Sequence, residues 1–234
     1  GVVQRLSLDR CDHPVHVYYP ESGQEFFDRL CAASIYDPRT ELIPHPVGPA
    51  SDGMVELYRA ESYALLAHGL EHSVPTIGFR LEEPDFPRFV PEKLNQAGVH
   101  GAQVGTLRRN GSVRIGDRIV RLEEVSVRRP GGSFAFVMDT RPCPGAVALA
   151  RDADLLVMEA TYTSGHQDLA DLYLHATAEG AARTAQSAGA HRLAMTHFSQ
   201  RYTDTQRHLE DARGIFENVI ALQDLDRVAI PRRP

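Results

Sequence analysis

The chain has little that would point to a disulfide scaffold, a zinc knot or a membrane protein. Its three cysteines, Cys11, Cys31 and Cys143, are scattered, and no two stand in a Cys-x-x-Cys spacing. Such cysteines are typical of reduced thiols in a cytosolic protein. No apolar run approaches the roughly 20 residues that a membrane span needs, and nothing resembles a signal peptide. We therefore expect a cytoplasmic protein that does not enter a membrane.

The chain also lacks an overall excess of positive charge. Its net charge is −6, so any binding of nucleic acid requires a local basic patch. The 234 residues are 42% apolar, which is enough for one large α/β domain or two small ones. The first residue is Gly1 and not methionine, which is consistent with a trimmed or fragmentary start.

The first half of the chain reads mainly as strands. Alternating and β-branched residues predict strands, and apolar residues at helical spacing predict one helix. The strands are expected at 14–20, 53–60, 62–68 and 75–82, the helix at 22–34, and a hairpin at 112–127 that turns at Gly116-Asp117. Residues 83–111 are rich in proline and glycine with little periodicity, so they read as an excursion from the domain.

The second half alternates between strand and helix. Strands are predicted at 133–140, 154–162 and 191–197, with helices at 143–153, 175–190 and about 205–216. This alternation is typical of a largely buried parallel sheet with right-handed crossovers, and it predicts the α/β class.

Three of these strands end in residues that suit a metal ion. Asp139, Glu159 and His197 close the strands, and His72 precedes another strand beside a proline turn. Ligands of α/β sheets collect beyond the carboxyl ends of the strands, and Asp with His suits Zn²⁺ or Mn²⁺. Each residue also has a structural interpretation, because a strand-end Asp often caps the next helix and a single His is often a surface or core residue.

Three further residues suit phosphate chemistry. His175 opens a predicted helix, and an imidazole there could protonate a leaving alkoxide or simply mark the helix entry. Arg201 offers a planar fork and Ser199 a hydroxyl just after His197, although both also fit a solvated polar loop.

Four blocks, in this order, make a resemblance specific. They read "EHSVPTIGFRLEE", "FAFVMDTR", "DLLVMEATY" and "HATAEGAARTAQSAGAHRLAMTHFSQRY". The chain resembles the bacterial ribonuclease Z family, the tRNA 3′-processing endonucleases of the metallo-β-lactamase superfamily, and most of all the actinobacterial members. The stretch "THFSQRY" is close to a family signature.

The resemblance implies an αββα sandwich and a two-metal site that takes Zn²⁺, with Mn²⁺ as another option. It implies that His72 and His197 are metal ligands and that Asp139 bridges two ions. His175 would give a proton to the departing ribose 3′-oxygen after in-line attack of a metal-bound hydroxide. The resemblance also implies that Ser199 and Arg201 hold the substrate phosphate. Glu159 would orient His175.

Residues 83–111 would be the arm that grips the tRNA precursor, usually across a homodimer, within a single domain that covers 1–234. Between Arg108 and Arg129 the chain has seven arginines against three acidic residues, a local charge of +4. Phosphate contacts need such a patch, although solvated hairpin faces would have the same composition.

The family's His-x-His-x-Asp-His motif is not among the 234 residues, and Asp12 to His16 has the wrong spacing. The resemblance places that motif before Gly1, so we expect a sandwich incomplete at its N-terminus. By itself the chain should hold one metal loosely and show no appreciable nuclease activity with added Zn²⁺ or Mn²⁺. Two alternatives are another hydrolase of this fold that acts on small esters and a non-catalytic protein that binds tRNA or dimerises.

Overall fold

The computed structural model describes residues 2–48 and 53–231. A seven-stranded sheet dominates it, in the order β13-β12-β11-β10-β5-β4-β3. Its strands are β3 (Val55–Arg59), β4 (Ala64–Leu70), β5 (Thr76–Glu82), β10 (Ser133–Val137), β11 (Leu155–Glu159), β12 (Leu193–Thr196) and β13 (Val219–Ala221). The first three form an antiparallel meander, and β10 to β13 run parallel to one another. The α/β class is therefore confirmed.

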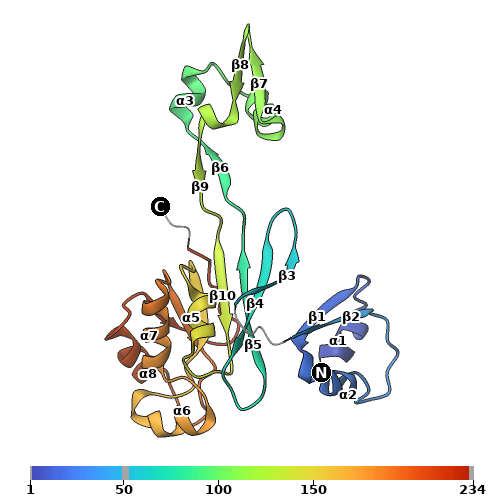
Figure 1. Ribbon diagram of the computed structural model, residues 1–234, viewed down its shortest axis with the longest axis vertical. Helices are drawn as coiled ribbons and strands as arrows, with labels where there is room; N and C mark the ends of the chain where they lie inside the picture. The colour runs from blue at the N-terminus through green and yellow to red at the C-terminus, as the bar shows by residue number, and fades with distance from the viewer. Residues whose placement is uncertain (1, 49–52, 232–234) are drawn as a thin grey trace.

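Helices cover one face of this sheet, as Figure 1 shows on its left. They are α5 (Pro144–Ala150), α6 (Gln167–Tyr173), α7 (Ala178–Ala188) and α8 (Gln206–Arg213), with a short 3-10 turn at Ser164–His166 before α6. Helix α7 buries five alanines at helical spacing, from Ala178 to Ala188. Small side chains there let the helix lie close to β11 and β12, where Leu156, Met158 and Leu193 fill the core.

Helix α7 begins later than the sequence suggests. Thr177 is its N-cap, with Oγ1 accepting a hydrogen bond from the Gly180 amide at 3.1 Å, and Gly189 ends it in the left-handed conformation. His175 therefore lies in the loop between α6 and α7 and does not open the helix, which corrects the expectation. The sequence analysis also missed α6, which has only seven residues and ends at Leu174, a C-cap in the left-handed conformation with φ +56°.

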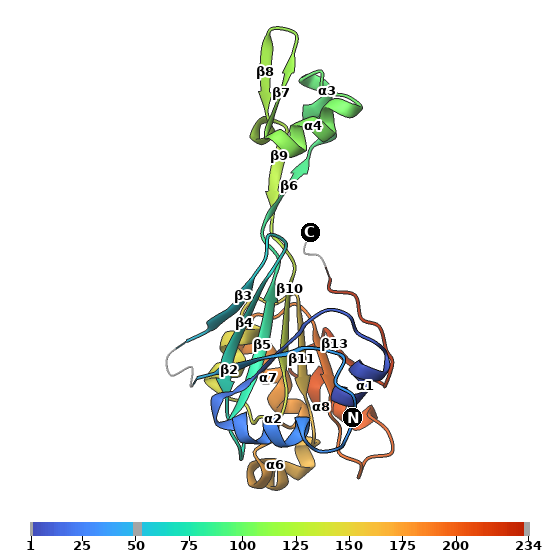
Figure 2. The ribbon, with the colours of Figure 1, turned by 90° about the vertical axis from the view of Figure 1, so that its right-hand side faces the viewer.

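A small unit lies on the other side of the sheet from the helices (Figure 2). It consists of α1 (Val2–Leu8), β1 (Val15–Pro20), a 3-10 turn at Glu21–Gly23, α2 (Gln24–Cys31) and β2 (Leu42–Val47). Strands β1 and β2 pair in parallel, and the His16 ring nitrogen lies 2.7 Å from that of His45. His16 thus belongs to this unit.

A protruding module extends from the end of the sheet where β5 ends and β10 begins (Figures 1 and 2). Its elements are β6 (Phe86–Phe89), α3 (Pro91–Gln96), α4 (Ala102–Asn110), β7 (Ser112–Ile115), β8 (Arg118–Arg121), a 3-10 turn at Leu122–Glu124 and β9 (Ser126–Arg129). We call residues 86–129 the arm. Its own core contains Val99, Leu107, Val120 and Val125. The arm is thus longer than the expected 83–111, because the hairpin β7–β8 completes that core.

His208 of α8 is a buried histidine on the helix side, and it leads to a testable prediction. Its ring lies edge-on to Phe198 and Tyr202, with centroids 4.8 and 4.6 Å apart. Burial lowers the pKa of His208, and Asp211, the Thr161 backbone and Asp204 oppose this only in part. The unfolded chain therefore binds the proton more readily, and stability should fall as the pH drops below about 6.5.

Replacing the histidine with a group that cannot titrate should remove that loss. His208→Leu is expected to flatten the acid limb of stability by up to about 1.4 kcal/mol per pH unit below pH 6.5. Urea unfolding between pH 5 and 8 measures this. An equal flattening by His191→Gln, which changes an exposed histidine, would contradict the assignment to His208.

Candidate metal and catalytic centre

The predicted site residues meet at one edge of the sheet, beyond the carboxyl ends of β10, β11 and β12. Asp139 follows β10, Glu159 ends β11 and His197 follows β12. Ligand atoms of these three residues and of His175 all lie within 4.8 Å of one another. Among the described residues this is the one cluster of its kind. The parallel strands bring the residues together, because β10, β11 and β12 end in register.

Two of these residues have an unusual backbone. Asp139 has φ +50° and His197 has φ +59°, both in the left-handed region. Asp and His are tolerated there better than most residues, but each such residue still costs on the order of 1 kcal/mol. The side chains of Asp139 and His197 meet, with His197 Nε2 3.2 Å from Asp139 Oδ1.

His72, in the loop between β4 and β5, is not one of these four residues but contacts His175. Its Nδ1 lies 3.1 Å from the Leu174 carbonyl oxygen, and its ring centroid is 4.9 Å from that of His175. The ring of His175 is in turn 5.4 Å from that of His197. The three histidines thus form a row with His175 in the middle.

Hydrogen bonds hold the His72 loop against the end of β10. The Glu71 amide donates to Thr140 Oγ1 at 3.1 Å, and the Arg141 amide donates to the Glu71 carbonyl at 3.1 Å. Arg141 also forms an ion pair with the Glu71 carboxylate at 2.7 Å. His72 and Asp139 are therefore kept close although 66 residues separate them in the sequence.

Glu159 is fully buried and receives hydrogen bonds from several sides. Its oxygens accept from the amide of Thr140 at 2.5 Å, the amide of Ala176 at 3.0 Å and the Thr161 hydroxyl at 2.7 Å. His175 Nδ1 lies 2.9 and 3.0 Å from the two oxygens. With these partners the carboxylate has little capacity left for a metal ion, so its geometry suits orienting His175.

These contacts determine which ring nitrogens are free. A carbonyl or carboxylate oxygen beside Nδ1 requires a proton on that nitrogen, which applies to His72 and His175. The other nitrogen, Nε2, then remains available on both rings. His72 is half-buried, and the His175 side chain is 16% exposed. The site is thus open to solvent on one side.

Ser199 and Arg201 lie just beyond His197. The Ser199 amide donates to the Thr161 carbonyl, and Arg201 Nε donates to Ser199 Oγ at 3.2 Å. The Arg201 guanidinium also lies over the Tyr162 ring, 5.3 Å from its centroid. Burial raises the pKa of the Tyr162 phenol, so the ring stays neutral beneath the cation. The guanidinium is exposed and held beside the cluster.

Tyr162, Thr161 and Thr140 are residues that the sequence analysis missed. Tyr162 and Thr161 stand in "MEATY" directly after Glu159, and Thr140 follows Asp139. Threonine and tyrosine at strand ends are common, so residue type alone would not single them out. Their proximity to the predicted site residues was the available signal.

Relatives among the curated proteins show the family. No protein-family model matches the chain. The chain is 46% identical over 234 residues to a ribonuclease Z of Nocardia farcinica, covering all of this chain and 76% of that protein. It is 45% identical over 235 residues to a ribonuclease Z of Streptomyces coelicolor, covering all of this chain and 75% of that protein.

Solved structures agree on the fold. The short form of human tRNase Z superposes with a TM-score of 0.63 at 22% identity, covering 99% of this chain and 73% of that one. The metallo-beta-lactamase fold protein YhfI of Bacillus subtilis superposes with a TM-score of 0.55 at 15% identity, covering 90% of this chain and 63% of that one. The chain has the metallo-β-lactamase fold and belongs to the ribonuclease Z family.

Proposed function

We propose that this chain supplies active-site residues of a metal-dependent endoribonuclease that removes 3′ trailers from tRNA precursors. The observation that carries the proposal is the Asp139–His175–His197 cluster in a chain 46% identical to a ribonuclease Z. The relatives favour this function over a small-ester hydrolase and over a non-catalytic tRNA-binding protein.

The donor set fits a divalent metal ion. His197 Nε2 and Asp139 Oδ1 are half-exposed and 3.2 Å apart, and the ring of His72 lies next to the cluster, against His175. A nitrogen and a carboxylate oxygen at this distance need a proton or a cation between them, and imidazole with carboxylate suits Zn²⁺ or Mn²⁺. We propose His72, Asp139 and His197 as ligands. A bound ion would lower the pKa of water and polarise the phosphate.

His175 is proposed as the proton donor. In the imidazolium form of His175, Glu159 holds Nδ1–H, and the second proton, on Nε2, can pass to the ribose 3′-oxygen when the bond from phosphorus to that oxygen breaks. The phosphate stays on the trailer, and the mature tRNA ends in a hydroxyl. Arg201 and Ser199 are proposed to hold the phosphate oxygens, with Tyr162 supporting the guanidinium.

We propose that the arm binds the body of the tRNA precursor. It carries nine basic residues against four acidic ones, a net charge of +5 in a chain of net −6. Among its described arginines Arg118 pairs with Glu124 and Arg128 with Asp85, whereas Arg109 and Arg114 form no carboxylate pair and are exposed. Such free cations suit phosphates.

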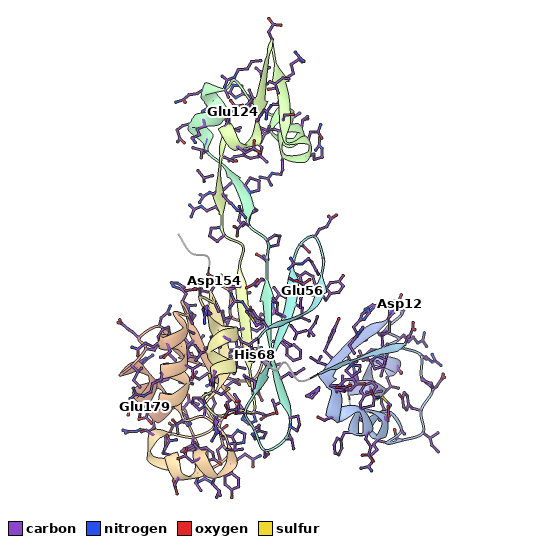
Figure 3. The ribbon with its side chains drawn as sticks, viewed as in Figure 1. Asp12, Glu56, His68, Glu124, Asp154 and Glu179 are labelled. Carbon is purple, nitrogen blue, oxygen red and sulfur yellow. The ribbon has the colours of Figure 1, made fainter. Side chains whose placement is uncertain are left out.

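The position of the arm supports a homodimer as part of this proposal. The site lies before β5 and the arm follows it, and the seven residues of β5 span about 23 Å. Figure 3 shows Asp154, which precedes β11, at the arm end of the body, with Glu124 far above it on the arm. Because the arm extends away from its own site, it is better placed to hold a tRNA for the site of a second copy.

No helix in the described parts of the chain is long and apolar enough to cross a bilayer. Cys11, Cys31 and Cys143 are free thiols, and together with a tRNA substrate they suit the cytoplasmic location that we propose.

Cleavage of a tRNA precursor tests the function directly. The protein expressed from its complete reading frame, with Zn²⁺ or Mn²⁺, should cut a precursor once at the 3′ side of the mature tRNA and leave a 3′-hydroxyl. Gel analysis of end-labelled precursor measures this, and chelation should abolish it. Cuts at many positions, or cleavage that survives chelation, would contradict the proposal.

A further inference from the structure

The hydroxyl of Thr161 lies between Glu159 and His197, two members of the cluster. Thr161 is 6% exposed, and its Oγ1 is 2.7 Å from Glu159 Oε2 and 2.9 Å from His197 Nδ1. One hydroxyl therefore contacts both the carboxylate that holds His175 and the imidazole that faces Asp139. Among the described residues, Thr161 is the one whose hydroxyl forms hydrogen bonds with both of these side chains.

Counting protons gives this hydroxyl a direction. It has a single hydrogen, and the Glu159 carboxylate can only accept. If the hydroxyl donated to His197 instead, its oxygen would face the carboxylate oxygen at 2.7 Å with no proton between them. It therefore donates to Glu159 and accepts from His197, so Nδ1 of His197 carries the proton and Nε2 is a free lone pair.

We infer that Thr161 is a positioning residue that keeps His197 Nε2 unprotonated and thereby keeps the space between His197 and Asp139 open to a cation. Without the hydroxyl, His197 can move its proton to Nε2 and donate it to Asp139 Oδ1, only 3.2 Å away. That direct hydrogen bond would occupy both lone pairs that a metal ion needs. With the Thr161 hydroxyl present, His197 and Asp139 can bind a metal ion. Without it, they can form a direct hydrogen bond with each other instead.

The inference rests on the proposed function for its use, but the tautomer it assigns does not depend on nuclease activity. Outer-sphere partners of metal-binding histidines commonly fix the tautomer in this way, and their loss weakens metal binding about 10–100-fold. The Thr161 hydroxyl also donates a hydrogen bond to Glu159, and Glu159 loses this bond when the hydroxyl is removed.

The test compares Thr161→Val, which removes the hydroxyl at nearly constant volume, with Thr161→Ser, which retains it. Thr184→Val is the matched control, because Thr184 is 3% exposed and its hydroxyl donates to the Gly180 carbonyl away from the site. Nitrogen-15 NMR of the imidazoles at pH 8 in metal-free protein reads the tautomer, and calorimetric titration with Zn²⁺ reads the affinity.

We expect Nδ1–H at His197 in the natural protein, in Thr161→Ser and in Thr184→Val, and Nε2–H in Thr161→Val. The Zn²⁺ affinity of Thr161→Val should fall about 10–100-fold, with Thr161→Ser and Thr184→Val close to the natural value. If Thr161→Val fails to fold, Thr161→Ala gives the same readouts.

Retention of Nδ1–H at His197 without the hydroxyl, or a Zn²⁺ affinity equal to that of Thr184→Val, would overturn the inference even in a protein that cleaves tRNA precursors. Conversely, the expected tautomer change and affinity loss in a protein that leaves tRNA precursors intact would uphold the inference and reject the proposed function.

Discussion

His175→Ala should reduce single-turnover cleavage of a tRNA precursor by about 10²–10⁴-fold while the metal content stays near that of the natural protein. The reason is the division of contacts at the site. Glu159 holds His175 Nδ1–H, so the imidazolium form of His175 presents Nε2–H as a proton donor, whereas His197 and Asp139 face each other as a ligand pair. Rapid-quench rates and metal analysis on the same preparation measure both quantities.

His166→Ala is the matched control for this experiment. His166 is also a half-buried histidine, but its Nδ1 lies 2.8 Å from the Tyr202 hydroxyl, whereas Nδ1 of His175 contacts Glu159. It should retain most of the cleavage rate. If His175→Ala instead loses its metal, His175 is a ligand and the proposed division of roles is wrong.

Removal of the arm should separate binding from chemistry. Replacing residues 86–129 with a short Gly-Ser linker should weaken binding of a tRNA precursor on the order of 100-fold at physiological salt, because the free cations of the arm are lost. Hydrolysis of a small phosphodiester should stay near its natural rate, since the arm has its own core and leaves the sheet at the end away from the site. Filter binding and a chromogenic diester measure the two effects.

Two point variants refine this experiment. Arg109→Gln and Arg114→Gln should each lower the slope of log affinity against log salt by about one. Arg118→Gln, whose arginine already pairs with Glu124, is the control and should change the slope less. Equal loss of binding and of diester hydrolysis on removal of the arm would show that the arm supports the fold and not the substrate.

Much of the fold could be predicted from the sequence because it depends on local patterns. Strands β3, β5, β10, β11 and β12 lie within the predicted ranges, β4 runs past its range of 62–68 to Leu70, and the hairpin turns at Gly116 as expected. Alternation and buried apolar runs specify such strands without knowledge of their partners. The elements that local patterns missed are short. Helices α1, α3 and α6 and strands β2 and β6 have no more than seven residues each, and α4 has nine.

The candidate site shows where local reasoning ends. Asp139, His175 and His197 could be singled out by residue type and position, and the structure brings them together. Glu159 had only a tentative role from sequence, because a glutamate at a strand end has many explanations. Its hydrogen bonds come from residues 140, 161, 175 and 176, which are near one another only when β10 and β11 pair in register.

The sequence by itself determined the family, the α/β class and the types of side chain available for metal and phosphate chemistry. Only the tertiary structure decided three things: the tautomers at the site, the extent of the arm and the end of the sheet from which the arm leaves. The physical reason is that strand patterns are encoded within a few neighbouring residues. A proton on His197, in contrast, depends on Thr161, 36 residues away, and on the buried carboxylate behind it.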